Sequence, residues 1–211
     1  MLDPERILPY LDSLVPPRPP ELQAMEAWAR DTDFPIIGPA AGHFCYQLTR
    51  LLGARAVFEM GSGFGYSTAW FARGVVENGG GTVHHVVWDA DLSRRAREHL
   101  TRLGFDGTIE YTVGEAVDSL ARTAGGFDII FNDIDKQAYP DSLPVVKRML
   151  RPGGVLIIDN MLWSGRIFDD GDISPATEGV REFTRRITSD ADWIVSLVPI
   201  RDGLILAWLR P

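Results

Sequence analysis

Cysteine is almost absent from this chain of 211 residues, because Cys45 is the only one. A single cysteine excludes an internal disulfide and any metal site built from several cysteines. Long hydrophobic runs are also missing, since none approaches the roughly 18 residues that a membrane-spanning helix needs. The N-terminus lacks the basic and then apolar pattern of a signal peptide. We therefore expect a cytoplasmic protein that does not enter a membrane.

Positive charge is scarce, since 21 Lys and Arg against 29 Asp and Glu leave a formal net charge of -8. Nucleic-acid binding needs a basic face, and the Arg-rich patches here, such as Arg94-Arg95 and Arg185-Arg186, are short. We expect no nucleic-acid partner. The length and the 45% hydrophobic content fit one globular domain over residues 1–211.

The first 38 residues read as an N-terminal helical extension of that domain. A weak helical pattern over residues 1–15 is stopped by Pro16-Pro17-Arg18-Pro19-Pro20, because proline cannot continue an α-helix. Glu21–Arg30 predicts a second helix and Ala40–Leu52 a third.

Beyond Gly53, short apolar segments alternate with helical ones. The predicted strands are Ala56–Met60, Val83–Trp88, Ile109–Val113, Phe127–Ile130 and Val155–Ile158, and the predicted helices are Ser67–Val76, Leu92–Leu103, Ala116–Ala121 and Tyr139–Leu150. This alternation is typical of an α/β fold, a parallel sheet with helices on both faces.

The C-terminal part breaks this alternation. A polar loop at Ser164–Pro175 and a helix at Thr177–Ser189 lead to two strands, Trp193–Pro199 and Leu204–Leu209, joined by an Asp-Gly turn. Such a turn predicts a hairpin, so the sheet should end with one antiparallel strand.

A glycine turn follows the first predicted strand, which ends in the acid Glu59. The turn and the start of the next helix contain Gly61, Ser62, Gly65, Tyr66 and Ser67. Such a turn brings bare backbone and a helix N-terminus close to a ligand, and the acid can hold that ligand's cationic or hydroxyl groups. Tyr66 stands where a dinucleotide fingerprint needs a small residue, which favours a ligand without a pyrophosphate. A plain strand-to-helix turn is the alternative.

The next two strands also end in residues suited to a nucleoside. Asp89 can accept hydrogen bonds from both hydroxyls of a ribose, whereas Asp91 is better placed to cap the following helix. Gly114-Glu115-Ala116 can receive an adenine edge, although taken alone it is an ordinary loop.

Oxygen-bearing side chains follow the fourth and fifth strands at Asp133, Asp159 and Asn160. They should meet at the carboxyl edge of the sheet and could hold a hard cation such as Mg²⁺, with positions left for water or substrate. The alternative is that they only cap a helix and make a turn. Lys136 could project into the same pocket, where a nearby cation would make its amine a usable base.

These motifs together resemble the cation-dependent O-methyltransferases of the caffeoyl-CoA and catechol O-methyltransferase type, which use S-adenosylmethionine (SAM). The resemblance runs from about Ala40 to the C-terminus. The motif residues that match are Glu59, Gly61, Gly65, Tyr66 and Ser67; Asp89; Gly114-Glu115-Ala116; Asp133, Asp135 and Lys136; and Asp159, Asn160, Leu162, Trp163, Ser164, Gly165 and Arg166.

The resemblance implies a Rossmann-like class I methyltransferase fold, with a seven-stranded, mostly parallel sheet that has one antiparallel strand. It implies SAM bound by Glu59, Gly61, Ser62, Gly65, Tyr66, Ser67, Asp89, Gly114, Glu115, Ala116 and Asp133. It also implies Mg²⁺, or Mn²⁺ or Ca²⁺, on Asp133, Asp159 and Asn160.

The implied reaction is methylation of one hydroxyl of an aromatic vicinal diol. The metal would chelate both hydroxyls, with Lys136 taking or stabilising the proton and Asp133 touching metal and cofactor. We expect His43, Lys136 and Trp163 to contact the substrate, and a homodimer because that family is commonly dimeric.

Two departures from the family bear on the substrate. The animal catechol enzymes use a late glutamate to bind the second hydroxyl, whereas the comparable region of this chain, around Ser196, has no glutamate. The loop Gly165–Pro175 contains Asp169, Asp170 and Asp172, which favours a small catechol over a polyanionic CoA thioester. The alternatives are a nicotinamide-dependent oxidoreductase, which the glycine spacing disfavours, and a SAM-binding protein without turnover.

Overall fold

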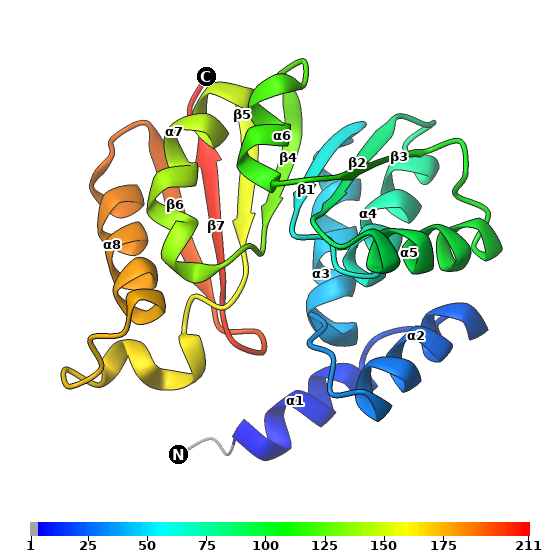
Figure 1. The fold of residues 1–211 in the computed structure, drawn as a ribbon, viewed down its shortest axis with the longest axis horizontal. Coiled ribbons are helices and arrows are strands. Elements are labelled where there is room, and N and C mark those ends of the chain that lie inside the picture. Colours follow the sequence, from blue (N-terminus) through cyan, green and yellow to red (C-terminus); the bar gives the residue numbers. More distant parts are fainter. Residues whose placement is uncertain (1–3) are drawn as a thin grey trace.

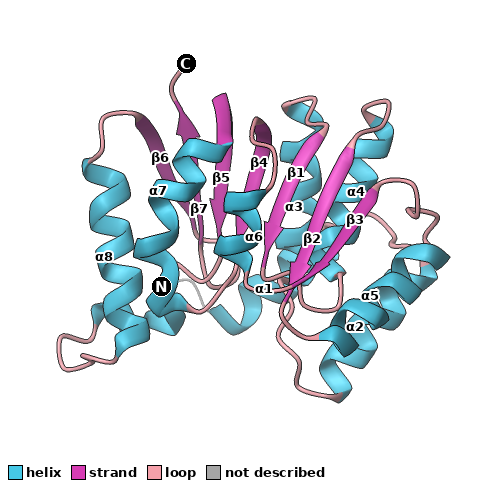
Figure 2. Cartoon of the chain, turned by 45° about the horizontal axis from the view of Figure 1, so that its top comes forward, coloured by secondary structure: helices cyan, strands magenta, loops and turns pink. Residues whose placement is uncertain are grey.

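A seven-stranded sheet runs through the middle of the molecule in the order β3-β2-β1-β4-β5-β7-β6 (Figure 2). The computed structural model describes residues 4–211. The strands are β1 (Ala56–Met60), β2 (Thr82–Val87), β3 (Ile109–Val113), β4 (Phe127–Asn132), β5 (Leu150–Ile158), β6 (Trp193–Val198) and β7 (Leu204–Leu209). All predicted strands are present in this part of the chain, with boundaries shifted by a few residues.

β7 is the antiparallel strand, and it pairs with β5 on one side and β6 on the other. The predicted mostly parallel sheet with one antiparallel strand is therefore confirmed. The expectation that this strand would end the sheet was wrong, because β7 lies inside and β6 forms the edge. Burial explains the order: most of Leu-Ile-Leu-Ala-Trp-Leu in β7 is buried, whereas β6 is largely exposed.

Helices cover both faces of the sheet (Figures 1 and 2). They are α1 (Pro4–Ser13), α2 (Pro20–Asp31), α3 (Gly38–Leu51), α4 (Tyr66–Glu77), α5 (Ala90–Arg102), α6 (Ala116–Arg122), α7 (Tyr139–Met149) and α8 (Pro175–Ser189), with short 3-10 helices η1 (Lys136–Ala138) and η2 (Trp163–Phe168). The helix predicted over residues 1–15 corresponds to α1, and residues 1–3 lie outside the described part.

Alternating side chains of the strands feed two separate cores. Val57 of β1 belongs to the core under α2, α3, α4 and α5, whereas its neighbour Phe58 belongs to the core under α6, α7 and α8. Because successive strand side chains point to opposite faces, a strand buried on both sides reads as a continuous apolar run. That is why the central strands were visible in the sequence.

The predicted N-terminal extension is partly built into the first of these cores. Leu22, Met25 and Ala29 of α2 are buried there, and the ring of Trp28 packs edge-on against Phe64, with centroids 4.6 Å apart. This packing brings the following segment, Phe34–Ile37, to the carboxyl edge of the sheet, where it lines the cavity described below.

None of the helices in residues 4–211 is long and apolar enough to cross a membrane.

Candidate active site

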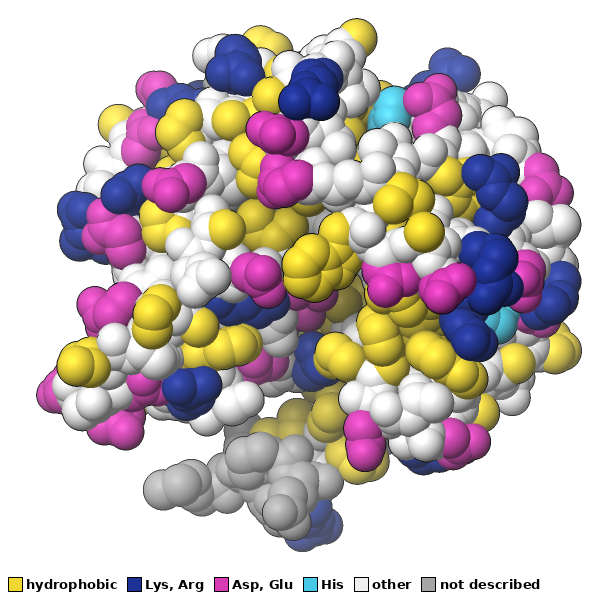
Figure 3. All heavy atoms as spheres, viewed as in Figure 1, with side chains coloured by type: hydrophobic (Ala, Val, Ile, Leu, Met, Phe, Trp, Pro, Cys, Tyr) yellow, Lys and Arg dark blue, Asp and Glu magenta, His cyan; other side chains and the backbone are white. Residues whose placement is uncertain are grey.

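A cavity of about 840 Å³ opens at the carboxyl ends of β1, β2, β4 and β5. Its volume is in the range of small-molecule sites, and open α/β sheets bind their ligands at this edge. Figure 3 shows the surface hollowed between the η2–α8 region and the α2–α3 region. The predicted site residues that line the cavity are Gly61, Ser62, Tyr66, Ser67, Gly114, Glu115, Ala116, Asp133, Lys136, Asp159, Asn160 and Trp163.

The glycine turn lets β1 and β4 approach each other closely. Gly61 has a φ of +85°, and a Cβ there would lie 2.3 Å from the carbonyl oxygen of Asp133. Gly65, with a φ of +92°, begins α4 and packs against Ala96 and Leu100 of α5. Gly65 is thus absent from the cavity lining, and it shapes the turn that carries Ser67 and the N-terminus of α4 to the cavity.

Glu59 lies behind this turn and does not line the cavity. Its side chain is fully buried, accepts a hydrogen bond from the Thr68 hydroxyl, and has one oxygen, Oε1, without a partner among the described residues. The Thr68 hydroxyl also lies 3.0 Å from Nδ1 of His85. Burial raises the pKa of Glu59 to about 7 against hydrogen bonds that lower it. The glycine turn therefore separates the Glu59 carboxylate from the cavity, and Glu59 could act on a bound ligand only through residues of that turn.

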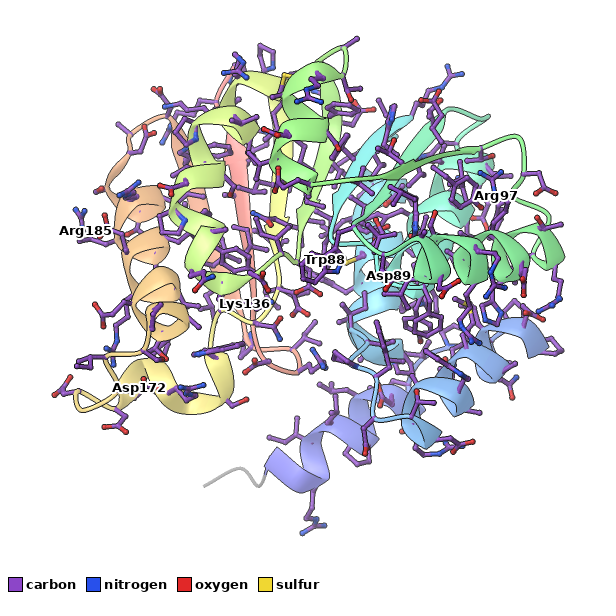
Figure 4. All side chains as sticks on the ribbon, in the orientation of Figure 1. Trp88, Asp89, Arg97, Lys136, Asp172 and Arg185 are labelled. Carbon is purple, nitrogen blue, oxygen red and sulfur yellow. The ribbon has the colours of Figure 1, made fainter. Side chains whose placement is uncertain are left out.

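Asp89, and not Asp91 as predicted, caps α5. Its Oδ1 accepts hydrogen bonds from the backbone N–H groups of Asp91 and Leu92, at 2.8 and 2.9 Å. Asp89 has the extended backbone of a capping residue, while Asp91 already lies in the first helical turn. The cap occupies Oδ1, and the neighbouring Trp88, 77% exposed, lines the cavity in place of Asp89. Figure 4 shows the two side chains together near the centre of this face.

The predicted adenine loop does reach the cavity. Gly114, Glu115 and Ala116 all line it. The Glu115 carboxylate itself caps α6 by accepting from the N–H groups of Val117 and Asp118, at 3.0 and 2.6 Å. The backbone and the Ala116 side chain are the parts of this loop that remain for a ligand.

Lys136, labelled in Figure 4, forms an ion pair with Asp133 on the other side of the cavity. The Lys136 ammonium donates to Oδ1 of Asp133 at 2.7 Å and to the carbonyl of Ile134 at 3.3 Å. It also lies over the rings of Tyr139 and Trp163, 5.2 and 5.8 Å from their centroids. These contacts hold the amine in place without covering the second Asp133 oxygen.

Asp159 and Asn160 follow β5, as predicted. Asp159 is only 1% exposed; its Oδ1 accepts from the Asn160 N–H at 2.8 Å, and its Oδ2 lies 3.3 Å from Nη1 of Arg201. Burial, reinforced by the charge of Asp133, raises the pKa of Asp159. The side-chain NH₂ group of Asn160 donates to the Asp202 carboxylate at 3.1 Å, so the amide oxygen of Asn160 points away from Asp202.

The donor chemistry of this group fits a hard divalent cation. Asp133, Asp159 and Asn160 each offer an oxygen, and burial together with the charge of Asp133 raises the pKa of Asp159. Within residues 4–211, no group of three or more His, Cys, Asp and Glu gathers for a metal. A cation here would therefore rest on two carboxylates and one amide, with positions left for other ligands.

The acidic loop after η2 is pinned at several points. Arg181 of α8 donates to the carbonyl oxygens of Arg166, Ile167, Asp169 and Asp172 at 2.6 to 3.3 Å. Asp172 also accepts from the Arg166 guanidinium and from the hydroxyl of Thr177, at 2.7 and 2.8 Å, and hydrogen bonds to Ser174, Arg166 and Thr177 lower its pKa. In Figure 4, Asp172 lies away from Lys136, at the outer side of this region.

The predicted contact of His43 with the substrate finds no support in this geometry. His43 is absent from the residues that line the cavity. It lies in α3, where its ring stacks on Tyr46 and meets Trp70 edge-on, with centroids 5.8 and 6.0 Å apart. Burial lowers its pKa. The structure thus does not bring His43 to the other predicted site residues.

Several cavity residues were missed by the sequence analysis: Phe34–Ile37, Trp88 and Arg201. The first segment carries no motif, and only the packing of α2 brings it there. Arg201 directly precedes the Asp-Gly pair that predicted the hairpin, so its position in the turn could have drawn attention to it.

Comparison with known proteins gives the relatives of this chain. A family profile described as O-methyltransferase matches residues 22–209. The chain is 31% identical over 183 residues to a catechol O-methyltransferase from Niastella koreensis, covering 82% of each chain. It is 33% identical over 175 residues to a catechol O-methyltransferase from Mycobacterium tuberculosis, covering 82% of this chain and 79% of that one.

A solved structure shares the whole fold. The O-methyltransferase TomG from Streptomyces achromogenes, crystallised in complex with SAM, superposes with a TM-score of 0.88 at 26% identity, covering 100% of both chains. The resemblance expected from the motifs and the predicted class I methyltransferase fold are thus confirmed, and the chain belongs to the O-methyltransferase family.

Proposed function

We propose that this protein transfers the methyl group of SAM to one hydroxyl of an aromatic vicinal diol, with a divalent cation as a second cofactor. One observation carries the proposal: Asp133, Asp159 and Asn160 bring three oxygens to the same cavity as the glycine turn, with the Lys136 amine beside them. A cofactor and a chelated diol could therefore occupy one space.

SAM would lie on the side of the cavity formed by β1, β2 and β3. The N-terminus of α4, with Tyr66 and Ser67, and the backbone of Gly61 would approach its methionine part, while the loop Gly114-Glu115-Ala116 would receive the adenine. Of the Asp89 carboxylate, only Oδ2 is outside the α5 cap, so a ribose contact would use that oxygen. TomG, which was crystallised with SAM, supports this cofactor.

The diol would lie on the side formed by β4 and β5. A cation on Asp133, Asp159 and Asn160, Mg²⁺ or Mn²⁺ or Ca²⁺, would supply Lewis acidity that makes a bound hydroxyl easier to ionise. The names of the two catechol O-methyltransferase relatives support a catechol-type substrate.

This chain's own residues would position and protect the reacting groups. Lys136, fixed by Asp133 and Ile134, would take the phenolic proton as a neutral amine or, as an ammonium, stabilise the phenolate that remains. Trp163 and the apolar segment Phe34–Ile37 would flank the aromatic ring and exclude water. Much of the rate would come from holding oxygen and methyl group at attack distance.

The test is mass-spectrometric detection of methyl transfer from SAM to catechols, caffeic acid and caffeoyl-CoA, with phenol as the matched acceptor that lacks the second hydroxyl. We expect methylated catechols with Mg²⁺, no product with EDTA, and no methylated phenol. Equal products with and without EDTA would contradict the metal. Tight SAM binding without any product would favour the binder without turnover, and NAD(H) binding would favour the oxidoreductase.

We also propose that the protein is a homodimer. Tyr10 of α1 and Leu14 just after it are 63% and 61% exposed, and a second copy could cover them. Light scattering after size-exclusion chromatography tests this, and a mass near 23.4 kDa, that of one chain, would contradict it.

A further inference from the structure

Disfavoured backbone conformations gather at one end of the cavity. Among residues 4–211, five residues other than glycine have a positive φ, and four of them, Asn160, Trp163, Ser164 and Arg201, belong to the segment after β5 and the turn that faces it. L side chains rarely adopt this region, and it persists only where the surroundings enforce it. Such clusters occur at ligand sites, and Arg201 is the member of this one with a cationic side chain.

The turn that carries Arg201 is fastened to the segment after β5. The N–H groups of Met161 and Leu162 donate to the carbonyls of Gly203 and Asp202 at 3.0 and 2.8 Å. The Asp202 carboxylate accepts from the Ser164 N–H at 2.6 Å and from the Asn160 amide at 3.1 Å. Arg201 therefore starts from a fixed backbone beside the proposed metal ligands.

The Arg201 guanidinium lines the cavity and has donors to spare. Its one hydrogen bond among the described residues goes from Nη1 to Oδ2 of Asp159 at 3.3 Å, and the side chain is 26% exposed. A guanidinium has five N–H donors, so most of them remain open to the cavity. Lys136, the other cation there, already donates to Asp133 and Ile134.

We propose that Arg201 is a specificity-determining residue that binds an anionic group, a carboxylate, on the aromatic diol. The inference rests on the proposed function and names the subset of diols that the site prefers. The planar fork of arginine matches a carboxylate with two parallel hydrogen bonds. The acids Asp135 and Glu115 also line the cavity, and its other cation, Lys136, is already paired with Asp133, so Arg201 is the cation with donors left for an anionic substituent.

The test compares 3,4-dihydroxybenzoate with its methyl ester, which keeps the diol and loses the charge. The wild-type protein should have a lower KM for the acid. Arg201→Gln should raise the KM for the acid at least about tenfold and leave the KM for the ester within about twofold, since a hydrogen bond to a charged group is worth about one decade or more. Arg201→Lys, which keeps the charge and loses the fork, should fall between.

Arg185→Gln is the matched control, because Arg185 is exposed on α8, lies away from Lys136 and Trp88 in Figure 4, and pairs only with Glu182 among residues 4–211. It should leave the acid-to-ester ratio unchanged. Equal KM values for acid and ester in the wild-type protein would overturn the proposal, even if Arg201→Gln fails to fold. An equal rise for both substrates in Arg201→Gln would also overturn it.

Calorimetry separates this proposal from the proposed function. In the presence of S-adenosylhomocysteine, the acid should bind the wild-type protein more tightly than the ester, and Arg201→Lys should reduce that preference. If no diol is methylated but this preference is found, the proposed reaction fails and the role of Arg201 stands. If diols are methylated without any preference for the acid, the role of Arg201 fails alone.

Discussion

Gly179 should control the position of Lys136 from the far side of η1. In α8, a Cβ at Gly179 would lie 2.3 Å from the Lys136 carbonyl oxygen and 2.8 Å from Cα of Gln137. Both are backbone atoms, so no side-chain rotation relieves the contact. Gly179→Ala therefore requires α8 and η1 to separate by about 1 Å to reach an ordinary contact of 3.4 Å.

This displacement is large compared with the contacts of the amine. The Lys136 ammonium lies 2.7 Å from Asp133, and a shift of about 1 Å breaks a hydrogen bond of that length. Misplacing a catalytic group by that amount costs about 100-fold in rate, so we expect kcat to fall between 10- and 100-fold. Alanine raises helix propensity by about 1 kcal/mol relative to glycine, which offsets part of the strain and favours a folded variant.

The assay is the initial rate of catechol methylation, with calorimetric binding of S-adenosylhomocysteine as the second readout. Cofactor affinity should stay unchanged, because the glycine turn of β1 does not contact Gly179. Gly107→Ala is the control, since nothing lies within 4 Å of a Cβ at that position. An unchanged kcat in a folded Gly179→Ala protein would refute the argument that Lys136 must be held where it is.

Lys136→Ala should lower kcat about 100-fold, and an unchanged initial rate would remove the amine from the reaction. Glu59 is buried with its pKa raised to about 7, so its protonated form stabilises the fold below its unfolded pKa of about 4.3, and this stability is lost as pH rises through 7. Glu59→Gln should therefore reduce the difference in unfolding free energy between pH 5 and pH 8 by about 2 to 3 kcal/mol, measured in urea; an identical difference would place the ionisation elsewhere. Asp202→Ala should remove the hydrogen bond that orients the Asn160 amide and weaken Mn²⁺ binding about tenfold. An unchanged Mn²⁺ affinity in calorimetry would show that Asp202 does not support the metal site.

The sheet was predictable from the sequence because its central strands are buried on both faces. Segments such as Phe127–Asn132 are mostly apolar and are bounded by glycine and acids, so local chemistry and fold agree. The inside position of β7 was not predictable from the Asp-Gly turn, which fixes a hairpin but not which of its strands meets β5. Burial of β7 against β5 decides that, and burial is a tertiary property.

The candidate site was predictable only where backbone position alone brings residues together. Asp133, Asp159 and Asn160 follow neighbouring strands, so topology carried them to one edge. The direction of each side chain could not be predicted from the sequence. Glu59 points inward behind the glycine turn. Asp89 caps α5 because its backbone is extended, and no sequence pattern indicates that conformation. Arg201 reaches the cavity through a turn conformation that its residue type disfavours.

The most direct test of the account is a calorimetric titration of Mn²⁺ into the metal-stripped protein and into Asp159→Ala, each also titrated with S-adenosylhomocysteine. We expect one Mn²⁺ per wild-type chain, loss of that binding in the variant, and equal cofactor affinity in both. Equal Mn²⁺ binding by the two proteins would contradict a metal held at Asp159. Loss of cofactor and metal together would show that Asp159 supports the fold and not the metal.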